Sequence, residues 1–332
     1  MNSIIRKISY YLPEKLLTNN HLEKRFPEWN AEKIENKTGI KGRHIANEDE
    51  TALDFGLKVA VRLLQDYDKS KIDFLLFCTQ SPDYYLPSGA CILQDKLGLR
   101  TDIGAFDYNL GCSGYIYGLA MASSFIKSGI AQNVLLITSE TYSKHINSKD
   151  KSNLTIFGDG ASATIIEKSE KKGIHKFALG TDGSGSENLI VPNGGLRNRY
   201  NPDAELIDDG SGSYRTKNNL FMNGPEIFNF TIKAVPIVVN QCLKKNNTTI
   251  DDIDYVIFHQ ANKYIIDYLR KKLKIPQDKF CIDLEYTGNT VSTTIPIALK
   301  NAIENGSVKA GDRILLVGYG VGYSWGATII EF

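Results

Sequence analysis

One of the five cysteines in the sequence, Cys112, has the setting of a nucleophile. It lies in the run Gly111-Cys112-Ser113-Gly114, directly before small and apolar residues that predict a helix over 113–127. A cysteine on a glycine-flanked turn at a helix N-terminus receives the positive end of the helix dipole, which favours the thiolate. We therefore expect the pKa of the Cys112 thiol to be lowered. The other four cysteines lie inside predicted strands or helices, the usual setting of buried and inert thiols.

Two further polar residues, His259 and Asn289, stand where a strand or a turn leads into a predicted helix. His259 ends the apolar run 255–259, and the carboxyl end of a buried strand is the usual place for a site in an open α/β sheet. Asn289 lies in a polar turn before the predicted helix 294–304. Taken singly, His259 would be a hydrogen-bonded structural residue and Asn289 a helix N-cap.

An internal repeat places these three residues at comparable positions. Residues 72–78 and 253–259 match apolar position for apolar position, and each run is followed at a similar distance by a turn, a helix and another apolar strand. We interpret this as a duplicated unit, whose corresponding loops would meet near a pseudo-two-fold axis. Cys112, His259 and Asn289 could therefore converge on one point.

Apolar runs alternate with helical stretches through most of the chain, which predicts an α/β protein with buried strands. The predicted strands are 74–79, 133–139, 161–167, 255–259 and 313–318, and the predicted helices are 51–65, 86–97, 113–127, 225–244, 262–272 and 294–304. The segment 181–219 is rich in Gly, Ser, Asn and Asp and predicts long surface loops.

The composition excludes several classes of protein. The chain has 332 residues, 42% of them hydrophobic, and a net charge of +1, so no global field would attract nucleic acid or an anionic membrane. No run approaches the roughly 20 apolar residues of a membrane span, and the N-terminal residues lack the apolar stretch of a signal peptide. We therefore expect a cytoplasmic protein. The cysteines form no C-x-x-C pair, so no zinc site is expected.

The ordered set of motifs resembles the 3-oxoacyl-(acyl-carrier-protein) synthase III family of the thiolase-like fold. The motifs are Thr38-Gly39-Ile40, Leu86-Pro87-Ser88-Gly89-Ala90-Cys91, the Cys112 turn, Phe157-Gly158-Asp159-Gly160-Ala161, His259-Gln260-Ala261-Asn262, Gly288-Asn289-Thr290 and Trp325-Gly326. The resemblance implies two similar βαβ halves packed as five layers, α-β-α-β-α. Residues 1–170 would carry the nucleophilic Cys, and residues 171–332 would carry the His and the Asn.

The resemblance also implies a chemistry, a decarboxylating Claisen condensation by the triad Cys112, His259 and Asn289. Cys112 would take an acyl group from a thioester such as acyl-CoA. A malonyl-acyl-carrier protein would then lose carbon dioxide, with His259 and Asn289 stabilising the enolate. Backbone N–H groups of Cys112 and Val321 would form the oxyanion hole during attack on the acyl-Cys112 carbonyl. No metal or other cofactor is implied.

The family resemblance extends to substrate binding and assembly. The residues expected to bind substrate or carrier protein are Lys37, Arg43, Lys263, Tyr264, Arg270, Lys271 and Lys272. Leu86 would reach across the interface of a homodimer to form the floor of the acyl pocket. Three positions depart from many relatives: Val321 stands for a glycine, Lys33 for a Trp and Tyr264 for an Arg. These departures favour a specialised acyl pathway over primary fatty-acid initiation.

Two other functions stay open from the sequence. The first is a non-condensing acyltransferase that passes the acyl group of acyl-Cys112 to an amine, hydroxyl or thiol; the presence of Asn289 argues against it. The second is a non-catalytic scaffold that binds carrier protein, against which all three triad residues argue. The sequence does not specify the primer chain, or whether coenzyme A or a carrier protein presents it.

Overall fold

The computed structural model describes residues 2–332, and two mixed β-sheets form its framework. The first sheet has the order β1-β7-β6-β4-β5. Its strands are β1 (Asn2–Tyr11), β4 (Phe74–Cys78), β5 (Gly104–Tyr108), β6 (Asn133–Glu140) and β7 (Gly160–Ser169). β4 is parallel to β5 and β6, whereas β7 is antiparallel to β6 and β1.

The second sheet repeats this arrangement, with the order β13-β14-β15-β8. Its strands are β8 (Ala178–Thr181), β13 (Tyr255–Phe258), β14 (Arg313–Gly320) and β15 (Ser324–Glu331). β13 is parallel to β14. A parallel bridge from Val256 to Phe280 extends the sheet beyond β13, at the position that corresponds to β5 in the first sheet. Antiparallel pairing of β15 with β14 and β8 completes the match. The duplication predicted from the sequence is confirmed.

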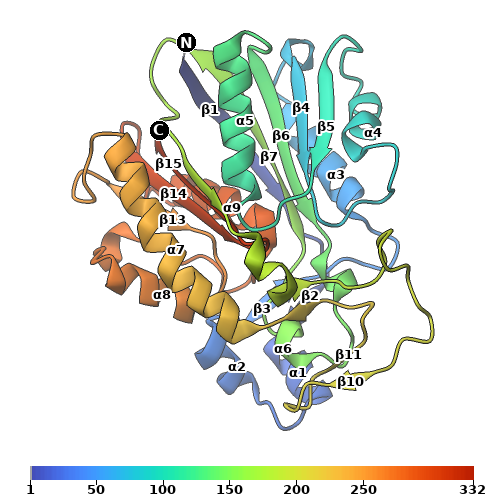
Figure 1. The fold of residues 1–332 in the computed structure, drawn as a ribbon. Coiled ribbons are helices and arrows are strands. Elements are labelled where there is room, and N and C mark those ends of the chain that lie inside the picture. Colours follow the sequence, from blue (N-terminus) through green and yellow to red (C-terminus); the bar gives the residue numbers. More distant parts are fainter. Residues whose placement is uncertain (1) are drawn as a thin grey trace.

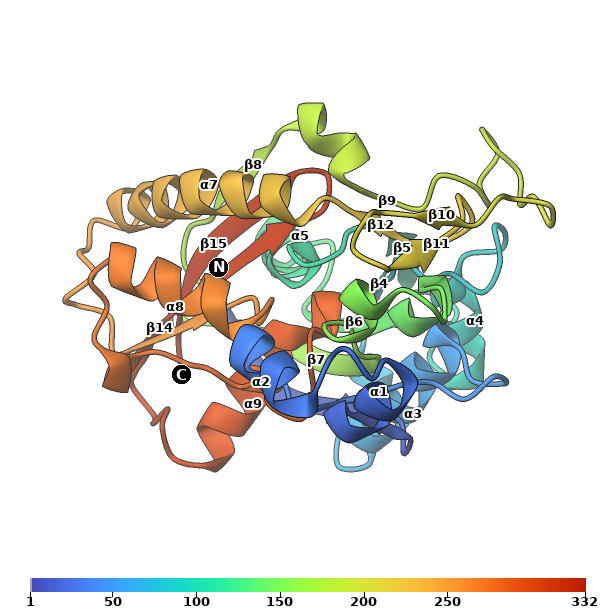
Figure 2. The ribbon, with the colours of Figure 1, turned by 90° about the horizontal axis from the view of Figure 1, so that it is seen from below.

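Helices and sheets form the five predicted layers (Figures 1 and 2). α5 (Gly114–Ser128) and α9 (Thr294–Glu304) lie between the two sheets and contact both. α3 (Ala52–Leu64) and α4 (Gly89–Lys96) cover the outer face of the first sheet, and α7 (Gly224–Lys245) and α8 (Lys263–Lys272) cover that of the second. Because helices cover both faces, strands such as β4 read as continuous apolar runs.

Smaller elements lie over one end of the two sheets (Figure 2). They are α1 (Asn19–Arg25), α2 (Ala31–Thr38), α6 (Lys151–Leu154), β2 (Leu16–Thr18), β3 (Gly42–His44), β9 (Leu189–Ile190), β10 (Ile207–Asp208), β11 (Tyr214–Arg215) and β12 (Phe221–Met222). The 3₁₀ helices are η1 (Lys69–Lys71), η2 (Tyr142–His145), η3 (Gly183–Asn188), η4 (Gln277–Lys279) and η5 (Val291–Thr293). The segment 181–219 consists largely of loops, as predicted. Among residues 2–332, no helix is long and apolar enough to cross a membrane.

Four strands of the two main sheets, β1, β5, β8 and β15, were not among the predicted elements. β1 carries the charged residues Arg6 and Lys7 in its middle, where its pairing with β7 shifts register. β5 ends at Asp107 and Tyr108, which the sequence predicts as the start of a turn. The Asp107 carboxylate accepts hydrogen bonds from the backbone N–H groups of Gly89 (2.5 Å) and Ala90 (2.6 Å), so it caps α4 from the end of a strand.

Candidate active site

Cys112 lies on the turn between β5 and α5, and its side chain is 6% exposed. The turn is closed by a hydrogen bond from Gly114 N–H to the Gly111 carbonyl (2.7 Å). Gly320, at the end of β14, packs directly on the nucleophile: a Cβ there would lie 2.9 Å from the Cys112 sulfur. Glycine at 320 therefore allows the second sheet to approach the thiol.

The electrostatic surroundings of Cys112 differ from the sequence prediction. Burial, and to a smaller extent the charge of Glu140, raises the pKa of the Cys112 thiol to about 12. The backbones of Cys112 and Val321 act in the opposite direction. The predicted lowering of the pKa is wrong for the free protein, because desolvation outweighs the helix N-terminus. The thiol must therefore lose its proton as it attacks.

The backbone of two residues influences the Cys112 sulfur. The backbones of Cys112 and Val321 lie next to it and lower the pKa of the thiol. Val321 follows Gly320 in the loop after β14, and its Cγ1 would lie 2.8 Å from a Cβ at Gly111. The Val321 side chain thus packs on the nucleophile's turn, while its backbone lies next to the sulfur.

His259 directly follows β13 and is buried. Its backbone N–H donates to the Val317 carbonyl (2.8 Å), and its ring Nδ1 shares a hydrogen bond with the Thr294 hydroxyl (2.7 Å). Burial lowers the pKa of His259 to about 3, so the imidazole is neutral. With Nδ1 engaged by Thr294, Nε2 is the ring atom left to act on a substrate.

The backbone around Asn289 fixes its amide group. The side-chain Oδ1 accepts a hydrogen bond from the Val291 N–H (2.9 Å), so the NH₂ group is the one left for a substrate. Val291 has φ 57°, a left-handed conformation that costs a β-branched residue about 1–2 kcal/mol. Asn289 also forms a parallel bridge to Phe157. Its backbone N–H donates to the Ile156 carbonyl and its own carbonyl accepts from the Gly158 N–H.

The structure links the three predicted catalytic residues. Tyr319 precedes the glycine that packs on Cys112, and burial together with the Cys112 charge raises the pKa of this phenol. The Tyr319 ring meets the His259 ring edge-on, with centroids 5.5 Å apart. Thr294, which binds His259, opens α9 directly after the short η5 helix that follows Asn289. Tyr319 thus lies between the loop beside Cys112 and the ring of His259, and Thr294 joins His259 to the segment that follows Asn289.

Two features of the site were missed by the sequence analysis. Thr294 orients His259, and the only signal for it is the hydroxyl-rich run that follows Asn289. Gln80 and Tyr142 form a polar pair, since the Tyr142 hydroxyl donates to Gln80 Oε1 (2.8 Å). Tyr142 belongs to the same apolar cluster as Cys112. Neither of this pair carries a sequence pattern that indicates its place.

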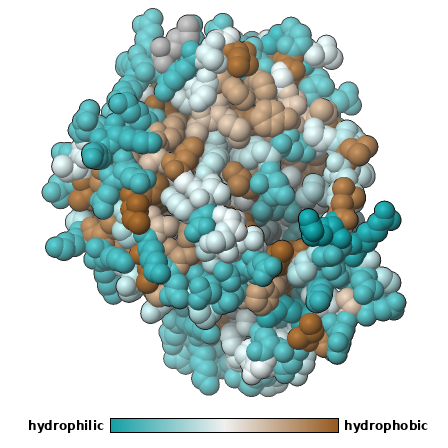
Figure 3. Space-filling view, in the orientation of Figure 1, coloured by the Kyte–Doolittle hydropathy of each residue, from teal (hydrophilic) through white to brown (hydrophobic). Residues whose placement is uncertain are grey.

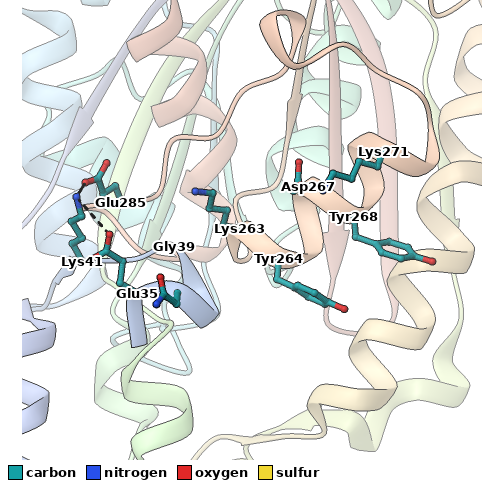
Figure 4. Close-up of a pocket in the computed structure, with 10 residues that line it drawn as sticks. Glu35, Gly39, Lys41, Lys263, Tyr264, Asp267, Tyr268, Lys271 and Glu285 are labelled. Atoms are coloured by element: carbon teal, nitrogen blue, oxygen red, sulfur yellow. Dashed lines mark ion pairs between the residues drawn. The ribbon is translucent and has the colours of Figure 1, made fainter. Parts of the chain in front are cut away.

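A cavity of about 500 Å³ opens between α2 and α8 (Figure 4). Its lining residues are Glu35, Asn36, Gly39, Lys41, Lys263, Tyr264, Asp267, Tyr268, Lys271 and Glu285. Three of the residues predicted to bind carrier protein, Lys263, Tyr264 and Lys271, are therefore part of its wall. Lys41 pairs with Glu285 (2.5 Å) and Lys271 with Asp267 (2.7 Å), so charges of both signs surround the opening.

The other predicted binding residues have varied placements. Lys37 Nζ lies 5.1 Å from the centre of the Trp29 ring. Arg270 pairs with Asp267 (2.9 Å), and Lys272 donates to the Ile232 carbonyl (2.8 Å).

Arg43 is enclosed in the protein interior. Its guanidinium donates to the carbonyls of Leu17 and Thr155 and to Asn19 Oδ1, and desolvation lowers its pKa to about 10. This placement argues for a structural role of Arg43 and against the substrate contact expected from the sequence. Leu86, in contrast, is 82% exposed. Among residues 2–332, no group of three or more His, Cys, Asp or Glu side chains could hold a metal ion.

Comparison with known proteins identifies the family. Residues 243–332 match the family model "3-Oxoacyl-[acyl-carrier-protein (ACP)] synthase III C terminal", and residues 106–183 match "3-Oxoacyl-[acyl-carrier-protein (ACP)] synthase III". Beta-ketoacyl-[acyl-carrier-protein] synthase III of Caldanaerobacter subterraneus subsp. tengcongensis is 39% identical over 325 residues, which cover 97% of this chain and 95% of the relative. The corresponding protein of Clostridium acetobutylicum is 38% identical over 335 residues, covering 100% of this chain and 99% of the relative.

Solved structures agree with the sequence relatives. A crystal structure of a 3-oxoacyl-(acyl-carrier-protein) synthase III is 44% identical and superposes with a TM-score of 0.98, covering 100% of both chains. The 3-oxoacyl-[acyl-carrier-protein] synthase III of Aquifex aeolicus VF5 is 35% identical, with a TM-score of 0.86 and the same full coverage. The resemblance read from the motifs is confirmed, and this chain belongs to the 3-oxoacyl-[acyl-carrier-protein] synthase III family.

Proposed function

We propose that this protein condenses an acyl thioester, acyl-CoA, with malonyl-acyl-carrier protein, releasing carbon dioxide and forming 3-oxoacyl-acyl-carrier protein. It would act as an acyltransferase with Cys112 as the acyl carrier. The observation that supports the proposal is the combination of a buried Cys112 against Gly320, a neutral His259 bonded to Thr294 and an Asn289 amide oriented by Val291. The relatives named above are synthases of this kind.

The first step is transfer of the acyl group to Cys112. The sulfur attacks the thioester carbonyl, a new S–C bond forms, and the bond to the coenzyme A sulfur breaks. The proton of the Cys112 thiol ends on the departing coenzyme A thiolate. Since the pKa of the thiol is about 12, this transfer has to accompany the attack.

The second step is decarboxylation of the malonyl group. Loss of carbon dioxide leaves an enolate with negative charge on the thioester oxygen. An N–H of neutral His259 and the NH₂ group of Asn289 would stabilise that charge, each preorganised donor contributing about 3 kcal/mol. Donation from His259 Nε2 requires Nδ1 to accept from the Thr294 hydroxyl (2.7 Å), which must then give up its 3.2 Å hydrogen bond to the Val291 carbonyl.

The third step joins the two carbon chains. The enolate carbon attacks the acyl carbonyl on Cys112, and the backbone N–H groups of Cys112 and Val321 would hold the oxyanion. Collapse of the tetrahedral intermediate breaks the S–C bond and returns the Cys112 thiolate, which takes up one proton from solvent. The cycle as a whole therefore consumes one proton, because the original thiol proton leaves with coenzyme A.

Carrier-protein docking is assigned to the helix that follows His259. Lys263, Tyr264 and Lys271 line the cavity beside α8, where cations can meet the phosphate of phosphopantetheine or acidic residues of the carrier. Arg270, Lys272 and the more distant Lys37 complete this proposed surface.

We further propose that the protein is a cytoplasmic homodimer. Each subunit would consist of two thiolase-like halves, residues 1–170 and residues 171–332. Figure 3 shows a broad apolar area on one face, where Figure 1 places α5 and the strands beside it. β5 is an edge strand with free pairing capacity. Tyr84, Tyr85 and Leu86, all exposed, stand in the loop before α4. A partner would cover these side chains and place Leu86 against its acyl pocket.

Intact-protein mass spectrometry tests the proposal. The protein and a Cys112→Ala variant are incubated with a series of acyl-CoA thioesters and then with malonyl-acyl-carrier protein. We expect an acyl adduct on the unmodified protein that the malonyl substrate discharges as 3-oxoacyl-carrier protein with release of carbon dioxide. An adduct discharged only by an amine, hydroxyl or thiol would establish a non-condensing acyltransferase instead.

A further inference from the structure

Glu140 is a fully buried carboxylate at the end of β6. It accepts hydrogen bonds from the Gln80 N–H (3.1 and 3.2 Å to its two oxygens), the Ser81 hydroxyl (3.1 Å) and the Ser292 hydroxyl (3.1 Å). No cation of the described chain contributes to its pKa, which burial raises to about 8. A buried carboxylate without a counter-ion is costly, so these donors are what stabilise it.

The Ser292 contact bears directly on Asn289. Ser292 lies in η5, and Val291 precedes it in the left-handed conformation that aims its N–H at Asn289 Oδ1. A strained residue keeps such a conformation only when its surroundings hold it. The hydrogen bond from Ser292 to Glu140 fixes the residue immediately after Val291, and so restrains the turn that orients the amide.

The other Glu140 contacts reach the nucleophile's side of the site. Gln80 and Ser81 follow β4, and the Gln80 side chain lies against the turn before Cys112, since a Cβ at Gly111 would lie 2.5 Å from Gln80 Oε1. Glu140 thus holds one loop from each half of the fold.

We propose that Glu140 is a positioning residue, which holds the Asn289 turn through Ser292 and thereby sets the rate of malonyl decarboxylation. This inference rests on the roles proposed above for Cys112 and Asn289. It assigns Glu140 no contact with substrate. When ionised, Glu140 raises the pKa of Cys112 and so disfavours the thiolate; its contribution therefore lies in the geometry of the turn.

Separate assays of the two half-reactions distinguish this role from a general structural one. Acylation is followed by mass spectrometry with acyl-CoA alone, and decarboxylation by carbon dioxide release from malonyl-acyl-carrier protein alone. For Ser292→Ala and Glu140→Gln we expect decarboxylation to fall about 10- to 100-fold, as for a small misplacement of a donor. Acylation should not fall by more than about threefold, since removing the charge does not oppose thiolate formation.

The matched control is Ser162→Ala. The Ser162 hydroxyl is buried and shares a hydrogen bond with Thr138 (2.8 Å) in the same sheet, and it forms no hydrogen bond to the described residues of the Asn289 turn. This variant should carry out both half-reactions at rates close to those of the unaltered protein. Equal loss of both half-reactions in Glu140→Gln and Ser162→Ala would overturn the proposal.

A double variant tests most directly whether Ser292 acts through Asn289. If Ser292 and Glu140 act through Asn289, adding Ser292→Ala to Asn289→Ala changes decarboxylation by less than about threefold. Independent, multiplying losses would contradict the inference. If the unaltered protein acylates Cys112 but releases no carbon dioxide, the proposed function fails; if it does both and the variants match it, only the role of Glu140 fails.

Discussion

The residue at the end of β4 in the first half of the fold corresponds to the residue that follows β13 in the second half. The two residues differ in type and in role. Residues 72–78 correspond to 253–259, so Cys78 in the first half occupies the place of His259 in the second. Cys78 is fully enclosed, donates to the Leu110 carbonyl (3.1 Å), and has its thiol pKa raised by burial. His259 is also buried, but Thr294 engages only one of its ring nitrogens.

A second pair of junctions extends the comparison. The turn before α5 carries Cys112 with the Val321 backbone next to its sulfur, and the turn before α9 carries Asn289 with its amide oxygen engaged. One half therefore supplies a covalent carrier, and the other supplies neutral donors for an enolate. The duplication provides matched positions, while the residue at each position and its hydrogen-bond partners decide which step it serves.

The largest difference should separate the two cysteines of the first half. Cys112→Ala removes the sulfur that would carry the acyl group, so we expect condensation to fall by at least about 10³-fold and the acyl adduct to vanish. Cys78→Ala should keep activity within about threefold while lowering stability by about 1–2 kcal/mol. Steady-state assays and thermal unfolding measure both effects. An adduct that survives in Cys112→Ala would place the carrier elsewhere.

The next effect concerns the second half alone. His259→Ala and Asn289→Ala each remove an enolate donor, and we expect malonyl decarboxylation to slow about 10²- to 10³-fold. Transfer of the acyl group to Cys112 should be retained in Asn289→Ala, because that amide serves only the enolate. Single-turnover measurements of each half-reaction test this division. Loss of acylation in Asn289→Ala would mean that the two halves do not divide the steps.

A smaller effect is expected where the halves touch. Gly320→Ala adds a Cβ 2.9 Å from the Cys112 sulfur, and we expect acylation to slow about 10- to 100-fold as the thiol is displaced. Gly183→Ala is the control, since a Cβ there meets no atom within 4 Å. Comparable acylation rates in the two variants would show that the close approach has no bearing on the nucleophile.

The smallest effect is a pH dependence that reports the burial of Cys112. A thiol with a pKa of about 12 gains thiolate tenfold per pH unit, so alkylation of Cys112 by iodoacetamide should rise steadily from pH 7 to pH 9. Over the same range His259, with a pKa near 3, stays neutral and adds no step, whereas ionisation of Glu140, with a pKa of about 8, opposes thiolate formation and makes the rise shallower. A rate already constant by pH 7 would show that the helix N-terminus dominates over desolvation.

Much of this fold follows from local pattern. Strands such as β4 and β14 are predicted because helices cover both faces and leave an unbroken apolar run. β1 was not predicted because Arg6 and Lys7 interrupt its apolar pattern, at the point where its pairing with β7 shifts register. Asp107 reads as a turn residue, yet it caps α4 from the end of β5, a contact between segments that no local pattern contains.

The candidate site, like the fold, is predictable from the sequence only in part. Residue type and position at a junction single out Cys112, His259 and Asn289, and the family resemblance assigns them one reaction. The pKa of Cys112 depends on the strands packed around it, so the helix dipole alone gives the wrong direction. The resemblance implies that Arg43 binds substrate or carrier protein, but Arg43 is enclosed by three backbone and side-chain oxygens. Glu140 comes directly after a predicted apolar strand, where an exposed charged residue is common. Its burial is therefore evident only from the tertiary structure.

The most direct measurement is peptide-level mass spectrometry of Asn289→Ala after incubation with acyl-CoA and malonyl-acyl-carrier protein together. The division of labour between the halves predicts that acyl groups accumulate on the peptide that contains Cys112 and persist, because acylation proceeds while decarboxylation does not. Discharge of the adduct at the rate of the unaltered protein, or an acyl group on any other residue, would contradict it.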